Sequence, residues 1–296
     1  MTASLSDCST SVADRSAELH QLAQRVRRHV VDMCAGTEGG HLGGSLSCVD
    51  ILTALYGAVL RVDPAAPDDP DRDIFLLSKG HGALALYATL AERGFLPVAE
   101  LAGYGRPGSR LMAHPVPAVP GVELPTGSLG HGLALGLGFA LAAQLAEGLP
   151  ARPNITGRVT RQRAFVVVGD GELQEGSCWE AALGAAGQRA DNLVAIVDRN
   201  GLQLTGRTED IGPLEPLTDR WRAFGWAARE VDGHDVDALV EALSSTPWTP
   251  GQPSVVIART VKGKGVPLMA GKVASHYAVL SERLHARAVR GLESLS

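Results

Sequence analysis

Short apolar runs alternate with helix-like patterns along most of this chain, and this alternation limits the fold more than any other feature. Between the runs, apolar residues recur every three or four positions, as they do along one face of a helix. Strands that alternate with helices form a parallel sheet that helices cover on both faces. We therefore expect one three-layer α/β domain over residues 1–296. The expected strands are 74–77, 165–168, 193–197, 227–231 and 254–260.

The segments between these runs predict helices and two irregular loops. A glycine-rich loop is expected after Gly36, and residues 102–126 hold prolines and glycines that oppose regular structure. The apolar stretch 133–146 is shorter than the roughly 20 residues that cross a membrane, so it predicts a buried helix. The expected helices are 14–36, 49–60, 83–93, 175–187, 236–243 and one that starts near Gly130.

Composition narrows the class of protein. The 27 basic and 32 acidic side chains give a net charge of −5, without the basic stripe that neutralises a nucleic-acid backbone. The cysteines at positions 8, 34, 48 and 178 form no Cys-x-x-Cys pair, and the N-terminus lacks a basic segment followed by an apolar run. We expect a cytoplasmic protein that binds neither nucleic acid nor membranes.

The strongest chemical signal is Gly-Asp-Gly at 169–171, directly after an expected strand, with Asp-Arg-Asn at 198–200 after the next strand. Because the carboxyl ends of parallel strands meet at one edge of a sheet, Asp170 and Asn200 can face one site. Mg²⁺ takes about six oxygens, which these two side chains, the Leu202 carbonyl and a diphosphate would provide. An isolated Gly-Asp-Gly is more often a tight turn. The asparagine at the next strand end favours a site.

These motifs, with others in the same order, resemble the thiamine-diphosphate-binding region of transketolases. The resemblance covers about residues 20 to 280. The chain departs from the family's usual pattern at Leu42, where proline is common, and at Tyr277, where glycine is common. The further matching motifs are Gly40-His41-Leu42-Gly43-Gly44-Ser45, Ser78-Lys79-Gly80-His81-Gly82, Gly127-Ser128-Leu129-Gly130, Glu175-Gly176, Trp179-Glu180-Ala181, Val231-Asp232-Gly233-His234-Asp235 and Thr260-Val261-Lys262-Gly263-Lys264-Gly265.

The resemblance implies a role for each candidate site residue. Asp170, Asn200 and the Leu202 carbonyl would bind Mg²⁺, or Ca²⁺ or Mn²⁺ in its place. Histidine suits proton transfer during ketose cleavage because its pKa lies near 6.5. The catalytic residues would be His41, His81, His114 and Glu175, with His41 and His114 facing the donor sugar. The implied cofactor contacts are His81, Gly127, Ser128, Leu129, Gly169, Asp170, Gly171, Glu172, Asn200 and His276.

Two features of the sequence have alternative interpretations. Glu175 is either a carboxylate that caps the following helix or, by the resemblance, part of a network at a subunit interface that couples two active sites. Lys262 and Lys264 are either a phosphate clamp or a solvated loop tip, because their spacing is not that of a P-loop.

The resemblance also implies an activity and a partner. The implied reaction is the thiamine-diphosphate-dependent transfer of a two-carbon ketol unit from a ketose to an aldose or aldose phosphate. A full-length transketolase continues with a pyrimidine-binding and a C-terminal domain, so we expect both on a partner chain, in a heterotetramer with two copies of each chain. The alternatives are another thiamine-diphosphate carboligation or decarboxylation with a 2-oxo acid donor, or a non-catalytic subunit that retains the fold.

Overall fold

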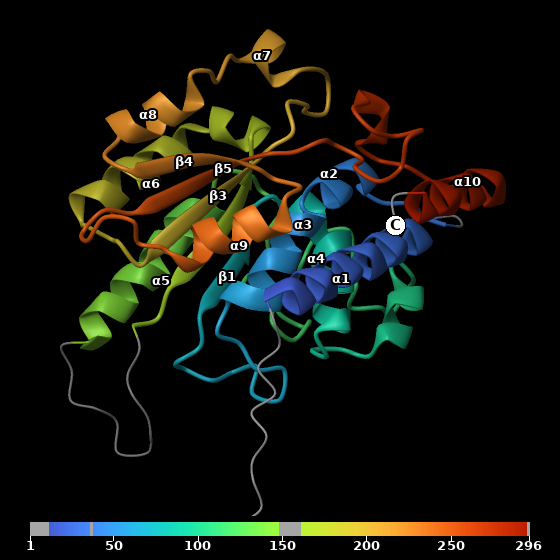
Figure 1. Cartoon of the computed structure of the whole chain (residues 1–296), viewed down its shortest axis with the longest axis horizontal. Coiled ribbons are helices and arrows are strands. Elements are labelled where there is room, and N and C mark those ends of the chain that lie inside the picture. Colours follow the sequence, from blue (N-terminus) through green and yellow to red (C-terminus); the bar gives the residue numbers. More distant parts are fainter. Residues whose placement is uncertain (1–11, 36–37, 148–160, 295–296) are drawn as a thin grey trace, which may run out of the picture.

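A five-stranded parallel sheet forms the centre of the computed structural model, which describes residues 12–35, 38–147 and 161–294 (Figure 1). The strand order is β1-β2-β3-β5-β4, and every neighbouring pair is parallel. The predicted strands are confirmed, with small shifts at their ends. Their bounds are β1 Ile74–Leu77, β2 Ala164–Gly169, β3 Leu193–Arg199, β4 Ala227–Asp232 and β5 Ser254–Arg259.

Both faces of the sheet are buried. In β2, Phe165 and Val167 pack into one apolar core, whereas Val166 and Val168 pack into the other. Successive side chains of a strand point to opposite faces, so these two cores lie on either side of the sheet. The predicted three-layer α/β class is therefore confirmed.

Helices cover the two faces as separate groups (Figure 1). The first group is α1 Val12–Met33, α2 Leu42–Ser47, α3 Val49–Ala54, α4 Ala83–Glu92, α9 Val236–Ser244 and α10 Glu282–Glu293. The second group is α5 Gly132–Glu147, α6 Gly176–Gly187 and α8 Leu217–Ala223. The short α7 Thr208–Ile211 follows β3. Of the predicted irregular loop 102–126, residues 104–126 form no helix or strand, whereas its first two residues end the 3-10 helix Val98–Gly103.

Two expectations about the helices are wrong in part. The glycine-rich segment after Gly36 is not all loop, because α2 begins at Leu42. Its glycines are places of close packing, since a Cβ on Gly44 would lie 2.9 Å from the His81 ring. The stretch 133–146 does form a helix, α5, but Leu145 is 75% exposed, so the helix is only partly buried.

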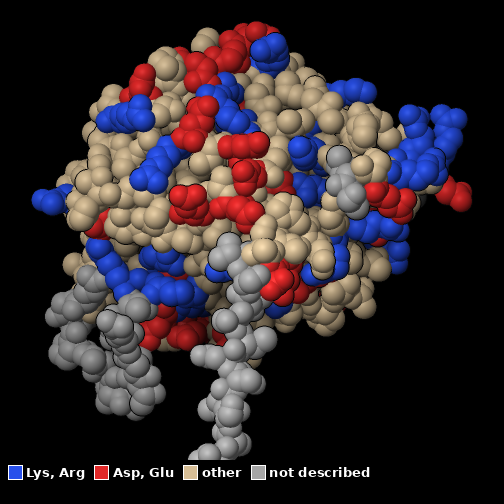
Figure 2. All heavy atoms as spheres, in the orientation of Figure 1, with Lys and Arg blue, Asp and Glu red and all other residues tan. Residues whose placement is uncertain are grey.

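The remaining sequence features are distributed as follows. Cys34, Cys48 and Cys178 are buried and unpaired, while Cys8 lies outside the described residues. Within the described ranges, no helix is long and apolar enough to cross a membrane. On the face drawn in Figure 2, acidic and basic side chains are interspersed, with basic side chains gathered over α10.

Candidate active site

The ends of β2 and β3 deliver polar side chains to one cavity. Gly169 lies opposite Asp198 in the parallel register of these strands, and Asp170 and Asn200 follow them. Both side chains line a cavity of about 360 Å³ at the carboxyl edge of the sheet. The two motifs are therefore brought to one place by strand register, as the sequence predicted.

The cavity gathers nearly all of the predicted site residues. Ser128 is the exception, because it is exposed and does not line the cavity. The roles of these residues stay predictions. The predicted residues in the lining are His41, His81, His114, Gly127, Leu129, Gly169, Asp170, Gly171, Glu172, Glu175, Asn200, Leu202 and His276, and the residues added by the structure are Gln174, Gln203, Leu204 and Lys262.

Asp170 is buried at the floor of the cavity and is held by backbone amides. Its Oδ1 accepts from the Gly171 N–H at 2.8 Å, and its Oδ2 accepts from the Gly201 N–H at 2.6 Å and from Arg199 at 3.1 Å. Burial, and then the nearby Asp198 carboxylate, raises the pKa of Asp170. A bound cation would offset both effects, because an opposite charge favours the ionised carboxylate.

The candidate metal ligands fit a hard cation that also binds phosphate. Asn200 Oδ1 accepts from the Leu202 N–H at 3.1 Å, which fixes the side chain near the strand end. In the described part of the chain, no group of three or more His, Cys, Asp or Glu side chains could hold a metal. A site with one carboxylate, one amide and one carbonyl needs further oxygens, and Mg²⁺ commonly takes these from phosphate and water.

Four histidines surround the same cavity. The ring centroid of His41 lies 5.9 Å from that of His81, 5.5 Å from that of His114 and 5.4 Å from that of His276. Gly127, with φ of 143°, makes room for one of them, because a Cβ there would lie 3.0 Å from the His114 ring. The imidazoles come from four separate segments of the chain, so only the fold brings them together.

Burial in the cavity disfavours the charged form of these imidazoles. Burial, and then His114, lowers the pKa of His41 to about 4, and burial and Lys262 lower the pKa of His276 to about 4. Burial and Lys79 lower the pKa of His81 well below its usual value. Among the described residues, the buried Nδ1 of His41 and the buried Oε1 of Gln203 have no hydrogen-bond partner. Such atoms cost free energy unless a ligand or water pairs with them.

Lys262 is a site residue that the sequence left open. Its side chain is 2% exposed, so the interpretation as a solvated loop tip is wrong. Its Nζ donates to the Leu202 carbonyl at 3.2 Å and lies 3.0 Å from His276 Nδ1. Burial, and then Lys79, lowers its pKa to about 8. A carbonyl oxygen has two lone pairs, so that of Leu202 can accept from Lys262 and still face a cation.

A buried ion pair supports the cavity from below, and sequence reasoning missed it. Lys79 and Asp198 are in contact, and both side chains are fully buried. Lys79 also donates to the Gly44 carbonyl at 2.7 Å, and Asp198 accepts from Ser47 at 2.6 Å and from Thr260. The pair thus joins α2, the segment after β1, the end of β3 and the end of β5.

The two glutamates near the cavity differ in their surroundings. Glu172 is buried and accepts from Ser78 and from the N–H groups of Gly130 at 2.9 Å and Gly169 at 3.0 Å, so it fixes the loops around the site. Glu175 is exposed at the start of α6 and makes no capping hydrogen bond. Glu175 therefore occupies the N-cap position that the capping interpretation gave it, near the positive end of the helix dipole, and its role at a subunit interface stays a prediction.

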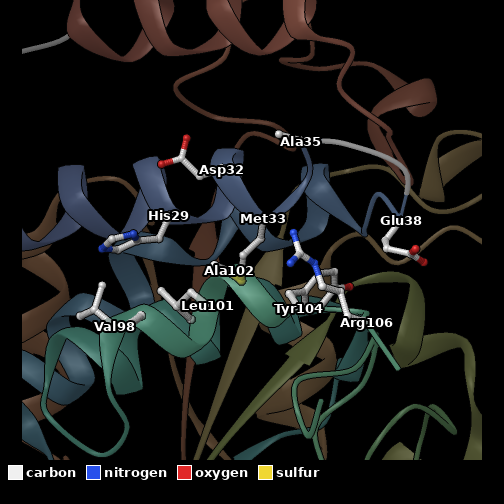
Figure 3. Close-up of a pocket in the computed structure, with 11 residues that line it drawn as sticks. His29, Asp32, Met33, Ala35, Glu38, Val98, Leu101, Ala102, Tyr104 and Arg106 are labelled. Atoms are coloured by element: carbon white, nitrogen blue, oxygen red, sulfur yellow. The ribbon is translucent and has the colours of Figure 1, made fainter. Parts of the chain in front are cut away.

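A second cavity, of about 550 Å³, lies between the end of α1 and the turn Val98–Gly103 (Figure 3). Its lining includes Met33, Leu101 and Arg106. The Asp32 carboxylate at its rim is already paired with Arg28 and His285. No strand end reaches this cavity, so the smaller one is the candidate active site.

Known proteins share both the sequence and the fold. Residues 19–292 match the family model described as transketolase, thiamine diphosphate binding domain. The chain belongs to the transketolase family. Among the relatives, a 6-deoxy-6-sulfo-D-fructose transketolase subunit of Clostridium sp. is 40% identical over 95% of this chain and 98% of its own length. An apulose-4-phosphate transketolase subunit of Actinobacillus succinogenes is 44% identical over 88% of this chain and 91% of its own.

Solved transketolase structures share the whole arrangement. Transketolase from Leishmania mexicana matches with a TM-score of 0.82 and 32% identity, over 91% of this transketolase-family chain. A mutant transketolase from Pichia stipitis also matches with a TM-score of 0.82, at 28% identity over 95% of this chain. In both cases the match spans 40% of the other chain. The predicted family is confirmed.

Proposed function

We propose that this chain is the cofactor-binding subunit of a two-component transketolase that transfers a two-carbon ketol unit from a ketose to an aldose or aldose phosphate. The observation that carries the proposal is the single cavity that joins Asp170 and Asn200 to four histidines. A non-catalytic subunit that merely retained the fold has no physical need for these side chains in one cavity.

We assign the residues of the cavity to the two ends of thiamine diphosphate and to the sugar. Asp170, Asn200 and the Leu202 carbonyl would hold Mg²⁺ with the diphosphate. Near the same end, His81, His276 and Lys262 would donate hydrogen bonds to the phosphate oxygens. The cofactor, when bound, supplies the nucleophilic carbon and the electron sink of the reaction.

The sugar side of the cavity needs groups that move protons. A neutral imidazole both donates and accepts, so His41 and His114 would hold the hydroxyl groups of the ketose and carry protons between its oxygens. Burial lowers the pKa of both histidines, which favours the neutral imidazole. Tyr277 packs its ring edge-on against His41 and donates to the Glu38 carbonyl, so it fixes the imidazole from the outer side.

We further propose a partner chain that closes the cavity and a pairing of two such units into a heterotetramer. Relatives of nearly the same length are named as subunits. Leu204, in the cavity lining, is 64% exposed, and we take it as part of the surface that the partner chain covers. The helices α5 and α6 pack together, and each exposes one leucine, Leu145 and Leu183, which we take as a face for a second copy of this chain. The buried thiols suit a reducing cytoplasm.

The experiment is an assay of this chain alone and mixed with a partner that bears the pyrimidine-binding domain. We expect no turnover by the single chain and ketol transfer by the mixture, without release of carbon dioxide. Donors with a phosphate and donors with a sulfonate both belong in the assay, because both occur in the names of the relatives.

Two results would favour the alternatives. Turnover of pyruvate with release of carbon dioxide would favour a 2-oxo acid donor. Full partner activity without this chain would favour a non-catalytic subunit.

A further inference from the structure

His234 lies outside the lining of the cavity, yet it contacts the loop that carries Lys262. It belongs to the Val-Asp-Gly-His-Asp motif at 231–235, between β4 and α9. Its side chain is 9% exposed, and none of the roles assigned above uses it. A nearly buried histidine with two specific partners calls for a physical explanation.

The two ring nitrogens of His234 connect two parts of the molecule. The backbone N–H of Val261 donates to its Nε2 at 2.8 Å. Because a backbone N–H can only donate, Nε2 is the unprotonated nitrogen, and the ring proton lies on Nδ1. Nδ1 faces the Asp50 carboxylate of α3 at 2.8 Å, and Arg27 of α1 contacts the same carboxylate. His234 therefore ties the 260–265 loop to two helices.

The tied amide lies next to the residue that enters the active site. Val261 directly precedes Lys262, whose Nζ reaches the Leu202 carbonyl and His276 at the cavity. On the other side of the tied amide, Thr260 donates to Asp198 at the end of β3. The backbone at Lys262 is thus held from the sheet by Thr260 and from the helices by His234.

We propose that His234 is a positioning residue of the cofactor site, which accepts the Val261 N–H and so holds the Lys262 amine at the Leu202 carbonyl. It touches no ligand itself. The identity of the ligand rests on the proposed function, whereas the contact between His234 and the loop does not.

Two substitutions separate the contact with the loop from the contact with Asp50. In His234→Gln the longer side chain places its amide oxygen near the former Nε2 and can still accept from Val261. In His234→Asn the shorter amide reaches Asp50 but not the loop. If His234 only stabilises the fold, the affinity of each variant for thiamine diphosphate should change only as far as its stability does. If His234 positions Lys262, the two variants should differ in affinity, because only the Gln variant keeps the contact with Val261.

The full chain is titrated with thiamine diphosphate in saturating Mg²⁺ by calorimetry, and amide hydrogen exchange is followed in peptides that cover 260–266. We expect His234→Asn to raise the Kd for thiamine diphosphate by about tenfold or more, because the loss of a group that orients a ligand-binding residue typically has an effect of this size. We expect its loop amides to exchange faster while β2 stays protected. His234→Gln should remain within about threefold of wild type, well short of that loss.

Asp235→Ala is the matched control. Asp235 caps α9 by accepting from the Ala238 N–H at 2.9 Å, so its loss should lower the Tm without changing the Kd. Equal Kd values for the Asn and Gln variants, or unchanged exchange at 260–266 in His234→Asn, would overturn the inference. If the wild-type chain does not bind thiamine diphosphate, the proposed cofactor role fails, and the exchange data alone decide the role of His234.

Discussion

Removal of one partner from the buried Lys79–Asp198 pair tests whether this contact holds the floor of the site together. Although burial alone would raise the pKa of Asp198, Lys79 outweighs it and holds the pKa below its usual value. Lys79→Met would leave the carboxylate buried without a cation, which typically costs about 3–5 kcal/mol of stability. Asp198 keeps the hydrogen bonds from Ser47 and Thr260. We therefore expect the lower end of that range, about 3 kcal/mol.

The assay is denaturant unfolding followed by the fluorescence of the buried Trp221 and Trp226. The set comprises Lys79→Met, Asp198→Asn and the double variant. Because each single change strands one charge, the double variant should lose much less stability than the sum of the two. The surface variant Asp219→Asn removes an exposed pair with Arg222 and should cost less than about 1 kcal/mol. Additive losses in the buried pair would refute the reasoning.

Two further predictions concern pH and assembly. Burial lowers the pKa of His41 from 6.5 to about 4. Between pH 6.5 and pH 4 the unfolded chain therefore binds more protons than the folded chain. The free energy of unfolding should fall as the pH drops through this range. His41→Gln should flatten this decline in denaturant unfolding at a series of pH values, and an unchanged slope would argue against the buried neutral imidazole. Leu183→Glu on α6 should halve the sedimenting mass if two copies pair through this face, whereas the exposed control Val98→Glu should not. A paired Leu183→Glu protein would rule out that face.

The strands, and the meeting of Asp170 and Asn200 at one edge of the sheet, could be predicted because local patterns determine them. The apolar run in β2 is buried on both faces, and a parallel register then places Asp170 and Asn200 at one edge. The amphipathic α10 also had a local signal that was missed. Ser281 caps it, and Ala288 and Leu292 recur four residues apart on its buried side.

The missed parts of the site depend on contacts between distant segments. Lys79 meets Asp198 across 119 positions, and no local pattern pairs them. Lys262 follows a strand within a glycine-rich run, which is typical of an exposed loop, whereas in the fold it packs beside Gly43 and His276 and is buried. The glycines of α2 indicated a loop, but Gly44 is required by the close approach of the His81 ring.

The central claim is that Asp170 and Asn200 hold one cation, which in turn holds a diphosphate. Calorimetry of the full chain with thiamine diphosphate, in Mg²⁺ and again in excess chelator, tests this most directly. We expect the wild-type chain to bind only with Mg²⁺ and Asp170→Ala to lose this metal-dependent binding while its near-ultraviolet circular dichroism stays native. Equal, Mg²⁺-dependent affinity in the wild-type chain and in Asp170→Ala would contradict the claim.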